Sequence, residues 1–336
     1  MIYKPNGLIL APLAGYTDLP YRKSARRHGC EYAFCEMVDA GSLVYGTKKT
    51  IRFLDRDPVE DWLGVQLLGS DTKTLREATK ILNEYEFDVL DFNLGCPAPK
   101  VSKKGEGAEL ARHYDKAITS FAAISSVSNK AVTAKIRILD DADPQPTIRL
   151  CQGLVDEGVK CITIHGRIKE KFYSGDVHFN ILKAVREAIT DTVQIVANGG
   201  VMSPVSYHQI MEETTLSEVM VARGAMGNPW IFNYLKSQEN FIPPTHSEFV
   251  TEVELHVNEM IDYYGDILAL KIARKVILDY LKGRGYGGTI KSKVSTIRTV
   301  EEFREFLKLL SDGPADSYWK WLETVKQPER PMRKEL

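Results

Sequence analysis

Eight short apolar runs, separated by segments with helical spacing, restrict the fold of this chain more than any other feature of its sequence. The runs have the length of buried strands, and they lie at 8–15, 32–38, 62–69, 89–96, 131–138, 160–167, 193–200 and 218–226. Strands that alternate with helices indicate right-handed crossovers and a parallel sheet. Because all eight units fit within the first 242 residues, the sequence predicts an α/β fold that closes into a (β/α)8 barrel, or TIM barrel, rather than an open doubly wound sheet.

The pattern changes after the segment Ile242–Thr245, where two consecutive prolines interrupt the chain. Thr245 and Glu248 have the spacing of a helix capping box. The apolar residues that follow repeat with helical spacing, namely Phe249, Val253, Val257, Met260, Ile261 and Tyr264. We therefore predict two domains, a barrel over residues 1–242 and a small all-helical domain over residues 243–336.

Composition indicates the class of protein and its compartment. The chain has 336 residues, of which 43% are hydrophobic, enough to bury a large core. No apolar stretch of the sequence reaches the length of a membrane span, and the first residues lack the ordered regions of a signal peptide. We therefore expect a cytoplasmic protein without membrane contact. The five cysteines form no CxxC pair, which favours a reducing compartment and no bound metal.

Four of the cysteines, Cys30, Cys35, Cys151 and Cys161, lie in or beside apolar runs and are expected to be buried. Cys96 differs from them because it ends a strand-like run within the segment DFNLGCPAPKV, residues 91–101. Glycine and proline flank this cysteine, and both residue types interrupt regular structure. Cys96 is therefore expected where a strand becomes a loop, a position at which a thiol can take part in chemistry.

Other polar residues that end strand-like runs should lie on the same rim of a barrel as Cys96. Active sites of such barrels occupy the carboxyl ends of the strands, and the loops after strands seven and eight commonly hold a phosphate. The residues are Lys135, Arg137, His165, Arg167, Asn198, Gly199, Gly200, Arg223 and Gly224. The glycines and Arg223 suit an anion, although each glycine could also serve only as a tight turn.

A phosphate site near Lys135 and Gln66 suits flavin mononucleotide (FMN). The lysine could stabilise negative charge on the reduced ring, and the glutamine amide could both donate to its pyrimidine edge and accept from it. The residues alone leave two alternatives open for Lys135, a Schiff-base nucleophile and the partner of a buried carboxylate.

Positive charge is concentrated near the C-terminus, although the net charge of the chain is −1. Between Lys271 and Arg298, eight basic residues accompany one acidic residue. Such a run is usually a solvated helix face, and the alternative is a phosphate-binding surface. On charge alone, we favour the solvated face.

Seven motifs, in their order along the chain, resemble the tRNA-dihydrouridine synthase family. They are APLAGYTDLPYR (11–22), VQLLG (65–69), DFNLGCPAPKVSKKGEGAEL (91–110), AKIR (134–137), HGR (165–167), ANGG (197–200) and ARGAMGNPWIF (222–232). The element asparagine-x-glycine-cysteine-proline is the most specific of them. The resemblance implies a flavin-binding TIM barrel with a C-terminal helical domain. It also implies reduction of the C5–C6 double bond of uridines in tRNA by FMN, which NADPH reduces.

Carried over residue by residue, the resemblance assigns Cys96 as the acid that protonates C5 of the uracil while a hydride reaches C6. It places at the flavin Pro12, Leu13, Ala14, Gln66, Lys135 and His165, and at the flavin phosphate Asn198, Gly199, Gly200, Ala222, Arg223 and Gly224. The candidates for recognising the uracil are Asn93, Arg137 and Arg167, with His165 beside them.

A tRNA substrate changes the interpretation of the basic residues, because the enzyme must extract a base while it grips distant phosphates. The resemblance therefore favours RNA contact by Lys100, Lys103, Lys104, Lys271, Arg274, Lys275 and Arg284. Two rival functions stay open. One is an FMN-dependent barrel enzyme that reduces a free pyrimidine or an enone, and the other is a non-catalytic RNA-binding relative.

Overall fold

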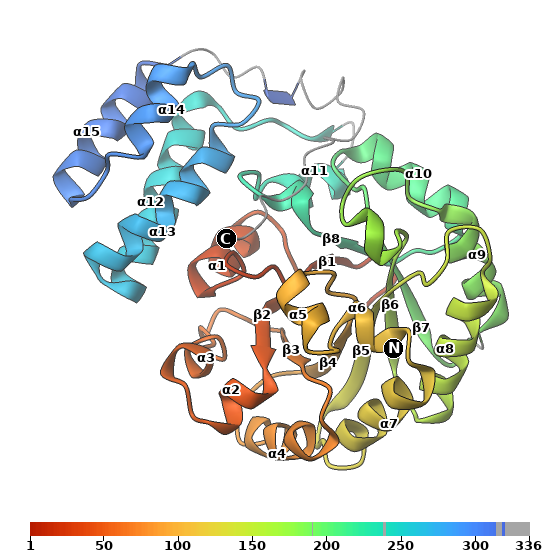
Figure 1. Cartoon of the computed structure of the whole chain (residues 1–336). Coiled ribbons are helices and arrows are strands. Elements are labelled where there is room, and N and C mark those ends of the chain that lie inside the picture. Colours follow the sequence, from red (N-terminus) through yellow and green to blue (C-terminus); the bar gives the residue numbers. More distant parts are fainter. Residues whose placement is uncertain (190, 238–239, 314–317, 320–336) are drawn as a thin grey trace.

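Eight parallel strands form a closed barrel in the computed structural model, which describes residues 1–189, 191–237, 240–313 and 318–319. Each strand pairs with the next along the chain, and β8 pairs with β1. The strands are β1 (Leu8–Leu10), β2 (Tyr32–Asp39), β3 (Leu63–Leu68), β4 (Val89–Leu94), β5 (Ala131–Arg137), β6 (Cys161–His165), β7 (Gln194–Asn198) and β8 (Val219–Val221). The predicted barrel is therefore confirmed (Figure 1).

Helices connect the strands and surround the barrel (Figure 1). They are α1 (Leu19–Arg27), α2 (Ala40–Val44), α3 (Lys48–Arg52), α4 (Thr72–Leu82), α5 (Pro99–Lys103), α6 (Ala108–Ala111), α7 (Tyr114–Ser125), α8 (Gln145–Asp156), α9 (Phe179–Ala188), α10 (Pro204–Thr214) and α11 (Ile231–Ser237), with short 3-10 turns η1 (Lys169–Lys171) and η2 (Arg223–Ala225). In the described ranges, no helix combines the length and hydropathy that crossing a membrane requires.

Several strands end earlier than their apolar runs, and the remaining residues form loops on the rim. β1 ends at Leu10, although the apolar run continues to Gly15. Pro12 has no N–H group for a sheet ladder, and Gly15 adopts a φ of +71°, which breaks the extended backbone. Pro12, Leu13 and Ala14, which were expected to line a flavin, therefore belong to a loop.

The inside of the barrel is apolar where the strands begin. Inward side chains from six strands pack together there, namely Ile9, Phe34, Val89, Cys161, Val196 and Met220. A Cβ atom on Gly64 would lie 2.3 Å from the ring of Phe34, so this glycine makes room for the phenyl group. The predicted burial of Cys30, Cys35, Cys151 and Cys161 is confirmed, and none of the five cysteines forms a disulfide.

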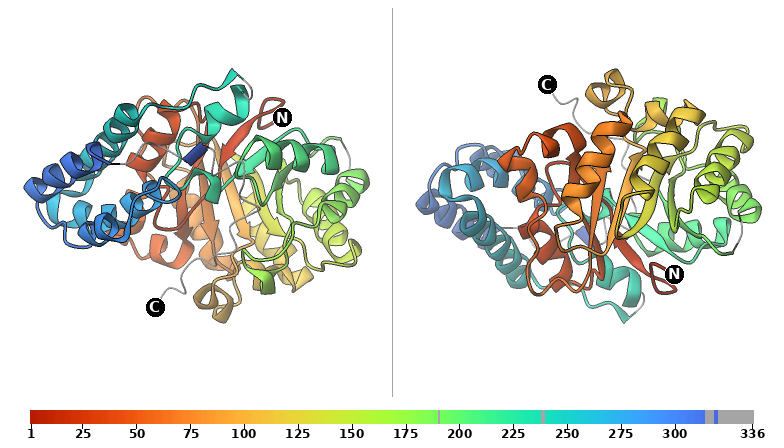
Figure 2. Two further views of the ribbon diagram at one scale, coloured as in Figure 1. Left: turned by 90° about the horizontal axis from the view of Figure 1, so that it is seen from above. Right: turned by 90° about the horizontal axis from the view of Figure 1, so that it is seen from below.

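In the described part of the chain that follows the barrel, the helices are α12 (His246–Tyr264), α13 (Asp266–Tyr280), α14 (Gly288–Val294) and α15 (Val300–Ser311). They share their own cluster of buried side chains, including Phe249, Ile277 and Phe303, and they lie to one side of the barrel (Figure 2). The predicted capping box begins α12, where Thr245 and Glu248 bond reciprocally. The domain boundary at 242 stays a prediction, and residues 314–317 and 320–336 of the second domain lie outside the described residues.

A buried polar cluster joins α12 to the first helix of the barrel. Glu252 accepts hydrogen bonds from Ser24 Oγ at 2.6 Å and from Arg27 Nη2 at 2.8 Å, and it lies 2.9 Å from His28 Nε2. Burial alone would raise the pKa of Glu252, but the bonds to His28, Arg27 and Ser24 lower it to about 2. This carboxylate therefore stays ionised and ties the helices to the barrel.

Candidate active site

The loops after the strands enclose a cavity of about 740 Å³ at the carboxyl end of the barrel. Most of the residues predicted from the sequence to bind a cofactor or a substrate line it. They are Pro12, Leu13, Ala14, Gln66, Asn93, Cys96, Lys100, Lys135, Arg137, His165, Asn198, Gly199, Gly200, Ala222 and Arg223. The structure thus brings together residues from segments far apart in the sequence.

Cys96 lines this cavity from the loop between β4 and α5, where it is partly exposed. Asn93 holds this loop, because its Oδ1 accepts hydrogen bonds from the backbone N–H groups of Gly95 at 3.1 Å and Cys96 at 2.9 Å. Gly95 packs closely on β5, and a Cβ atom there would lie 3.2 Å from the carbonyl oxygen of Lys135. The glycine lets the loop pass over β5, and the asparagine fixes where the thiol stands.

A row of buried polar side chains crosses the inside of the barrel below Cys96. The strand register places Gln66 beside Asp91, and Asp91 beside Thr133. Asp91 accepts hydrogen bonds from Gln66 Nε2 at 2.7 Å and Thr133 Oγ1 at 2.6 Å, and Gln66 Oε1 accepts from Asn93 Nδ2 at 2.7 Å. Our sequence reasoning missed Asp91, although a carboxylate within an apolar strand-like run is a signal that could have identified it.

Lys135 lies next to this row on β5. Its Nζ donates to Asn198 Oδ1 at 3.0 Å, and Asn198 Nδ2 donates to the carbonyl oxygen of Met220 at 2.7 Å. The side chain of Asn198, which was expected at a phosphate, therefore orients the lysine. Burial, reinforced by the charge of Arg137, lowers the pKa of Lys135 to about 8, while Asp91 and Cys96 oppose this shift. The side-chain amino group of Lys135 is therefore still mostly protonated at pH 7.

Three arginines surround the loop that follows β6. Arg137 donates from Nε to the carbonyl oxygen of Gly95 at 2.8 Å and from Nη1 to that of Phe172 at 2.7 Å. Arg167 Nε donates to the carbonyl oxygen of Gly175 at 2.8 Å, and Arg223 Nη2 donates to that of Tyr173 at 3.2 Å. Arg137 thus links the Cys96 loop to the loop after β6. Arg167 is buried and does not line the cavity, so it supports this wall from behind.

The arginines give one wall of the cavity a positive potential. Burial, together with the charges of Arg223 and Arg137, lowers the pKa of Arg167 to about 10, and Asp176 opposes this shift. The pKa of His165 is held well below its usual value by burial and by the neighbouring cations, so its imidazole is neutral. Its Nδ1 is buried without a hydrogen-bond partner in the described structure. An anionic ligand would reduce the repulsion among the cations and could accept a hydrogen bond from Nδ1 of His165.

Glycines shape the loops after β7 and β8. Gly199 and Gly200 line the cavity with φ values of +127° and +75°, which favour glycine and expose the backbone. Gly224 does not line the cavity, and a Cβ atom there would lie 2.4 Å from the carbonyl oxygen of Val201. Gly224 is therefore required for close packing of the two loops.

The residues of the predicted basic surface differ in their exposure and in their contacts. Lys100, Lys103, Lys104, Lys271 and Lys275 are exposed, and Lys104 forms an ion pair with Asp39 at 3.1 Å. Arg274 donates from Nε and Nη2 to the carbonyl oxygen of Ile297, at 2.9 and 2.6 Å. Lys275 donates to the carbonyl oxygen of Gly15 at 2.8 Å, and its Nζ lies 3.3 Å from the ring centroid of Tyr16. Both of these groups therefore hold the protein together.

The prediction that Arg284 contacts RNA is wrong. Arg284 is only 1% exposed, and its guanidinium lies 4.1 to 5.6 Å from the ring centroids of Tyr318, Phe249 and Trp230. An arginine stacks readily on aromatic rings, so a basic residue within a charged run can belong to a core.

Further residues on the rim were missed in the sequence. Tyr16 and Tyr173 line the cavity, and the ring centroid of Tyr173 lies 5.4 Å from the guanidinium of Arg137 and 4.9 Å from that of Arg223. Lys48 and Lys49 are exposed on α3, and the charge of Lys49 reaches the buried Glu36 of β2. An aromatic residue in a loop or a lysine on a short helix carries little sequence signal, so these residues needed the structure.

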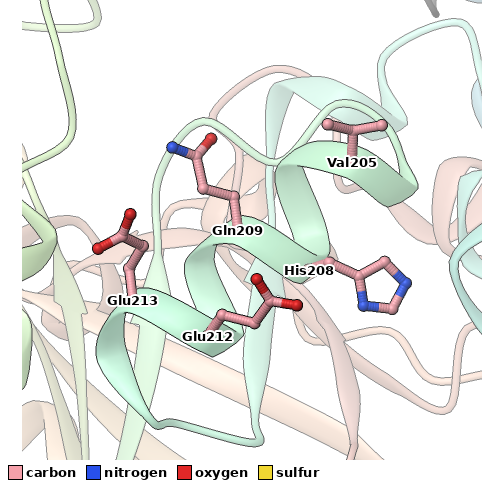
Figure 3. A pocket seen from close by; sticks show the side chains of 5 residues that line it. All are labelled: Val205, His208, Gln209, Glu212 and Glu213. Atoms are coloured by element: carbon pink, nitrogen blue, oxygen red, sulfur yellow. The ribbon is translucent and has the colours of Figure 1, made fainter.

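A second hollow lies over the outer face of α10 and is lined by Val205, His208, Gln209, Glu212 and Glu213 (Figure 3). All five residues come from one helix, α10. Across the described residues, no group of three or more histidine, cysteine, aspartate or glutamate side chains could hold a metal ion. The cavity at the carboxyl end of the barrel is therefore the candidate active site.

Known proteins resemble this chain along nearly its whole length. The tRNA-dihydrouridine synthase B of Vibrio cholerae is 30% identical over 314 residues, which cover 92% of this chain and 97% of that protein. The protein of the same name from Xanthomonas axonopodis is 32% identical over 300 residues, covering 87% of this chain and 89% of that protein. Among solved structures, histamine dehydrogenase from Rhizobium sp. 4-9 matches with a TM-score of 0.52 at 10% identity, covering 91% of this chain and 62% of that chain.

The structural match supports the barrel fold alone, because so low an identity says nothing about chemistry. The family profile described as dihydrouridine synthase (Dus) matches residues 9–312, a range that begins within β1 and contains β2 to β8 and helices α1 to α15. With relatives about 30% identical over nine tenths of its length, this chain belongs to the dihydrouridine synthase family.

Proposed function

We propose that this protein is a tRNA-dihydrouridine synthase, a flavin-dependent oxidoreductase that reduces the C5–C6 double bond of uridines in tRNA. The proposal further names FMN as the flavin, NADPH as its reductant and the cytoplasm as its location. The observation that carries it is the meeting of Cys96, Gln66 and Lys135 in one cavity that has a cationic wall. Membership of the family and the names of its relatives support the same activity.

The residues of the cavity fit an FMN. The cations around His165 give this wall the charge that an anionic phosphate favours, and the buried Nδ1 of His165 has no partner in the described structure. The backbone of Gly199 and Gly200, which lines the cavity, and the guanidinium of Arg223 would hold that phosphate, and Pro12, Leu13 and Ala14 would line the ring. Gln66 and Lys135 would contact its polar edge. When reduced, the flavin supplies the hydride that C6 of the uracil accepts.

Cys96 is the proposed catalytic acid. Its thiol would give a proton to C5 of the uracil, which leaves a thiolate on the loop. Lys135 and Arg137 both interact electrostatically with Cys96, so their charges would stabilise that thiolate. Asn93 fixes the backbone beneath the thiol, and Arg137 ties the same loop to the opposite loop through Gly95 and Phe172. The chain thereby holds the proton donor at a defined place.

The exposed lysines would bind the phosphates of the tRNA. Lys100 and Lys103 lie on α5, directly after Cys96, and Lys271 lies on α13 of the helical domain. Lys48 and Lys49 on α3 extend the exposed positive charge along the rim. Arg274 and Lys275 would act by holding the helical domain together and by holding it against the β1 loop.

The test is dihydrouridine formation in an unmodified tRNA that is incubated with the purified protein, FMN and NADPH, and analysed by mass spectrometry. We expect product with the parent protein and a loss of at least about a hundredfold in rate with Cys96→Ala, the scale typical of a lost general acid. Free uridine, run in parallel, separates this activity from the reduction of a small pyrimidine or enone.

The outcomes distinguish the competing functions. Oxidation of NADPH without any dihydrouridine in the tRNA would contradict the proposal and favour a small-molecule oxidoreductase. A protein that binds tRNA but retains no flavin would favour a non-catalytic relative. Full activity of Cys96→Ala would remove Cys96 as the acid while leaving the substrate in place.

A further inference from the structure

Asp91 is a buried acidic residue that the proposed chemistry does not use. It is 2% exposed, and it lies beneath the cavity wall because Gln66 and Asn93 line the cavity while Asp91 does not. Both of its hydrogen-bond donors, Gln66 and Thr133, are neutral groups. A buried carboxylate with neutral partners costs free energy, which calls for a reason to retain it.

The carboxylate imposes a direction on the neighbouring amides. Burial raises the pKa of Asp91 to about 6, against the bonds from Gln66 and Thr133 and the charge of Lys135, and in the structure both of its oxygens accept hydrogen bonds. An ionised carboxylate can only accept hydrogen bonds. Gln66 must therefore turn Nε2 toward Asp91, and its Oε1 then faces Asn93.

The same constraint passes on to the loop that carries Cys96. Because Oε1 of Gln66 is an acceptor, Asn93 must turn Nδ2 toward it. Asn93 Oδ1 is then the atom that meets the N–H groups of Gly95 and Cys96. One buried charge thus fixes the donor and acceptor ends of two amides and the backbone beneath the thiol.

We propose that Asp91 is a positioning residue of this active site. It fixes the orientation of the Gln66 amide that would meet the polar edge of the flavin. Through Asn93 it also fixes the position of Cys96. The flavin part of this inference rests on the proposed function, whereas the Cys96 part depends only on the contacts described above.

Two single variants and their combination test the inference. Asp91→Asn, Gln66→Glu and the double variant are compared with the parent for the dissociation constant of FMN, measured by fluorescence quenching. The second readout is the rate at which iodoacetamide alkylates Cys96, measured by peptide mass spectrometry. Cys30, Cys35, Cys151 and Cys161 are buried, so their alkylation reports unfolding in the same sample.

Each single variant should disturb both readouts. An asparagine at position 91 can donate as well as accept, so Gln66 can adopt either orientation; we expect FMN to bind about tenfold more weakly, the equivalent of one hydrogen bond. The loop loses its fixed anchor, and Cys96 should be alkylated about threefold faster or more. Gln66→Glu places two carboxylates against each other and should have the larger effect on both.

The double variant separates positioning from general stability. It exchanges the two partners, because the new amide donates to the new carboxylate, which still accepts from Asn93. We expect Cys96 alkylation to return to within about twofold of the parent rate, while FMN binding stays weak because a carboxylate faces the ring. Thr163→Val on β6, at a threonine that is 3% exposed, is the control and should leave both readouts within about twofold.

The inference is overturned if Asp91→Asn leaves both readouts at parental values, or if the double variant is alkylated as fast as the worse single variant. If Asp91→Asn does not fold, folding of the double variant supports the inference, and failure of both contradicts it. Should the parent itself bind no FMN, the proposed function fails, and the alkylation rates still decide whether Asp91 positions Cys96.

Discussion

The α1–α12 interface and the rim of the barrel both gather positive charge, but they balance it differently. At the interface, Arg27 donates to the carboxylates of Glu252 and Glu259, and His28 contacts Glu252. At the rim, Arg137, Arg167 and Arg223 donate to backbone carbonyl oxygens instead. A carbonyl oxygen completes a hydrogen bond but leaves the net charge in place.

The difference indicates that the interface serves stability, whereas the rim is suited to binding an anionic ligand. The interface neutralises its own cations, so its free energy serves to hold the helices on the barrel. At the rim, burial and the repulsion among neighbouring cations lower the pKa values of Arg167 and His165, and Asp176 opposes the shift of Arg167. Cations that repel one another destabilise the site without a ligand, so the site gains stability when an anion binds.

Removing the interface carboxylate should have the largest effect on stability. Glu252→Gln removes the buried carboxylate that Arg27 and His28 contact, and we expect a loss of about 2–3 kcal/mol, less than for a fully buried pair because Arg27 is exposed. Urea unfolding at pH 7, with and without FMN, should show this loss without a change in FMN affinity. Glu254→Gln, at an exposed site on the same helix, should change stability by less than about 0.5 kcal/mol. A loss below about 1 kcal/mol for Glu252→Gln would show that this carboxylate contributes little to holding α12 on the barrel.

Acid should remove the same contribution. The pKa of Glu252 is about 2 in the folded protein, below its ordinary value of 4.5, so the unfolded chain binds the proton first. The stabilisation, roughly 3 kcal/mol at most, is present above pH 4.5 and is lost as the pH falls toward 2. The difference in unfolding free energy between the parent and Glu252→Gln should therefore shrink over this range. Acid-sensitive groups that do not interact with Glu252 act in both proteins and cancel. If the difference in unfolding free energy did not change with pH, the loss in Glu252→Gln would come from packing rather than from the charge of Glu252.

The sequence predicted the barrel well because its eight units repeat a simple pattern. The inner face changes from apolar to polar along single strands, as from Val89 to Asp91 and Asn93 on β4, and the polar positions mark the rim. The motif around Cys96 also predicted a loop, because glycine and proline act on the backbone locally. These features depend on residues that are neighbours in the chain.

The remaining features depend on which residues meet in space. Arg284 and Lys271 belong to one basic run, yet one stacks inside an aromatic core and the other faces solvent. Likewise, Asn198 was expected at a phosphate, and its side chain orients Lys135 because β5 and β7 lie on either side of β6 in the barrel. Charge counts along the chain cannot separate such cases, since packing decides them.

At the rim, removing a buried cation should stabilise the flavin-free protein. Lys135→Met deletes an ammonium whose pKa is lowered to about 8, and we expect a gain of about 1–2 kcal/mol at pH 7, less than full burial implies because the side chain is partly exposed. The folded protein releases this proton more readily than the unfolded chain, so the cost is fully present below pH 8 and disappears as the pH rises toward 10.5. Urea unfolding of both proteins at pH 7 and 9.5 should show the gain shrinking, while dihydrouridine formation is lost. A variant less stable than the parent at pH 7 would show that the lysine helps to hold the barrel.

The smallest expected effect is stabilisation of the flavin-free protein by inorganic phosphate. If the rim cations lack a counter-charge, phosphate at several times its dissociation constant should raise the unfolding free energy by about 1 kcal/mol relative to sodium chloride of equal ionic strength. Arg223→Gln should abolish this gain, because Arg223 lines the cavity beside the glycine loops. Arg304→Gln on α15, at an exposed arginine, should keep it. Equal stabilisation of the parent and both variants would mean that phosphate acts on the whole surface, and the contrast between a neutralised interface and a charged rim would then fail as a guide to where the anion binds.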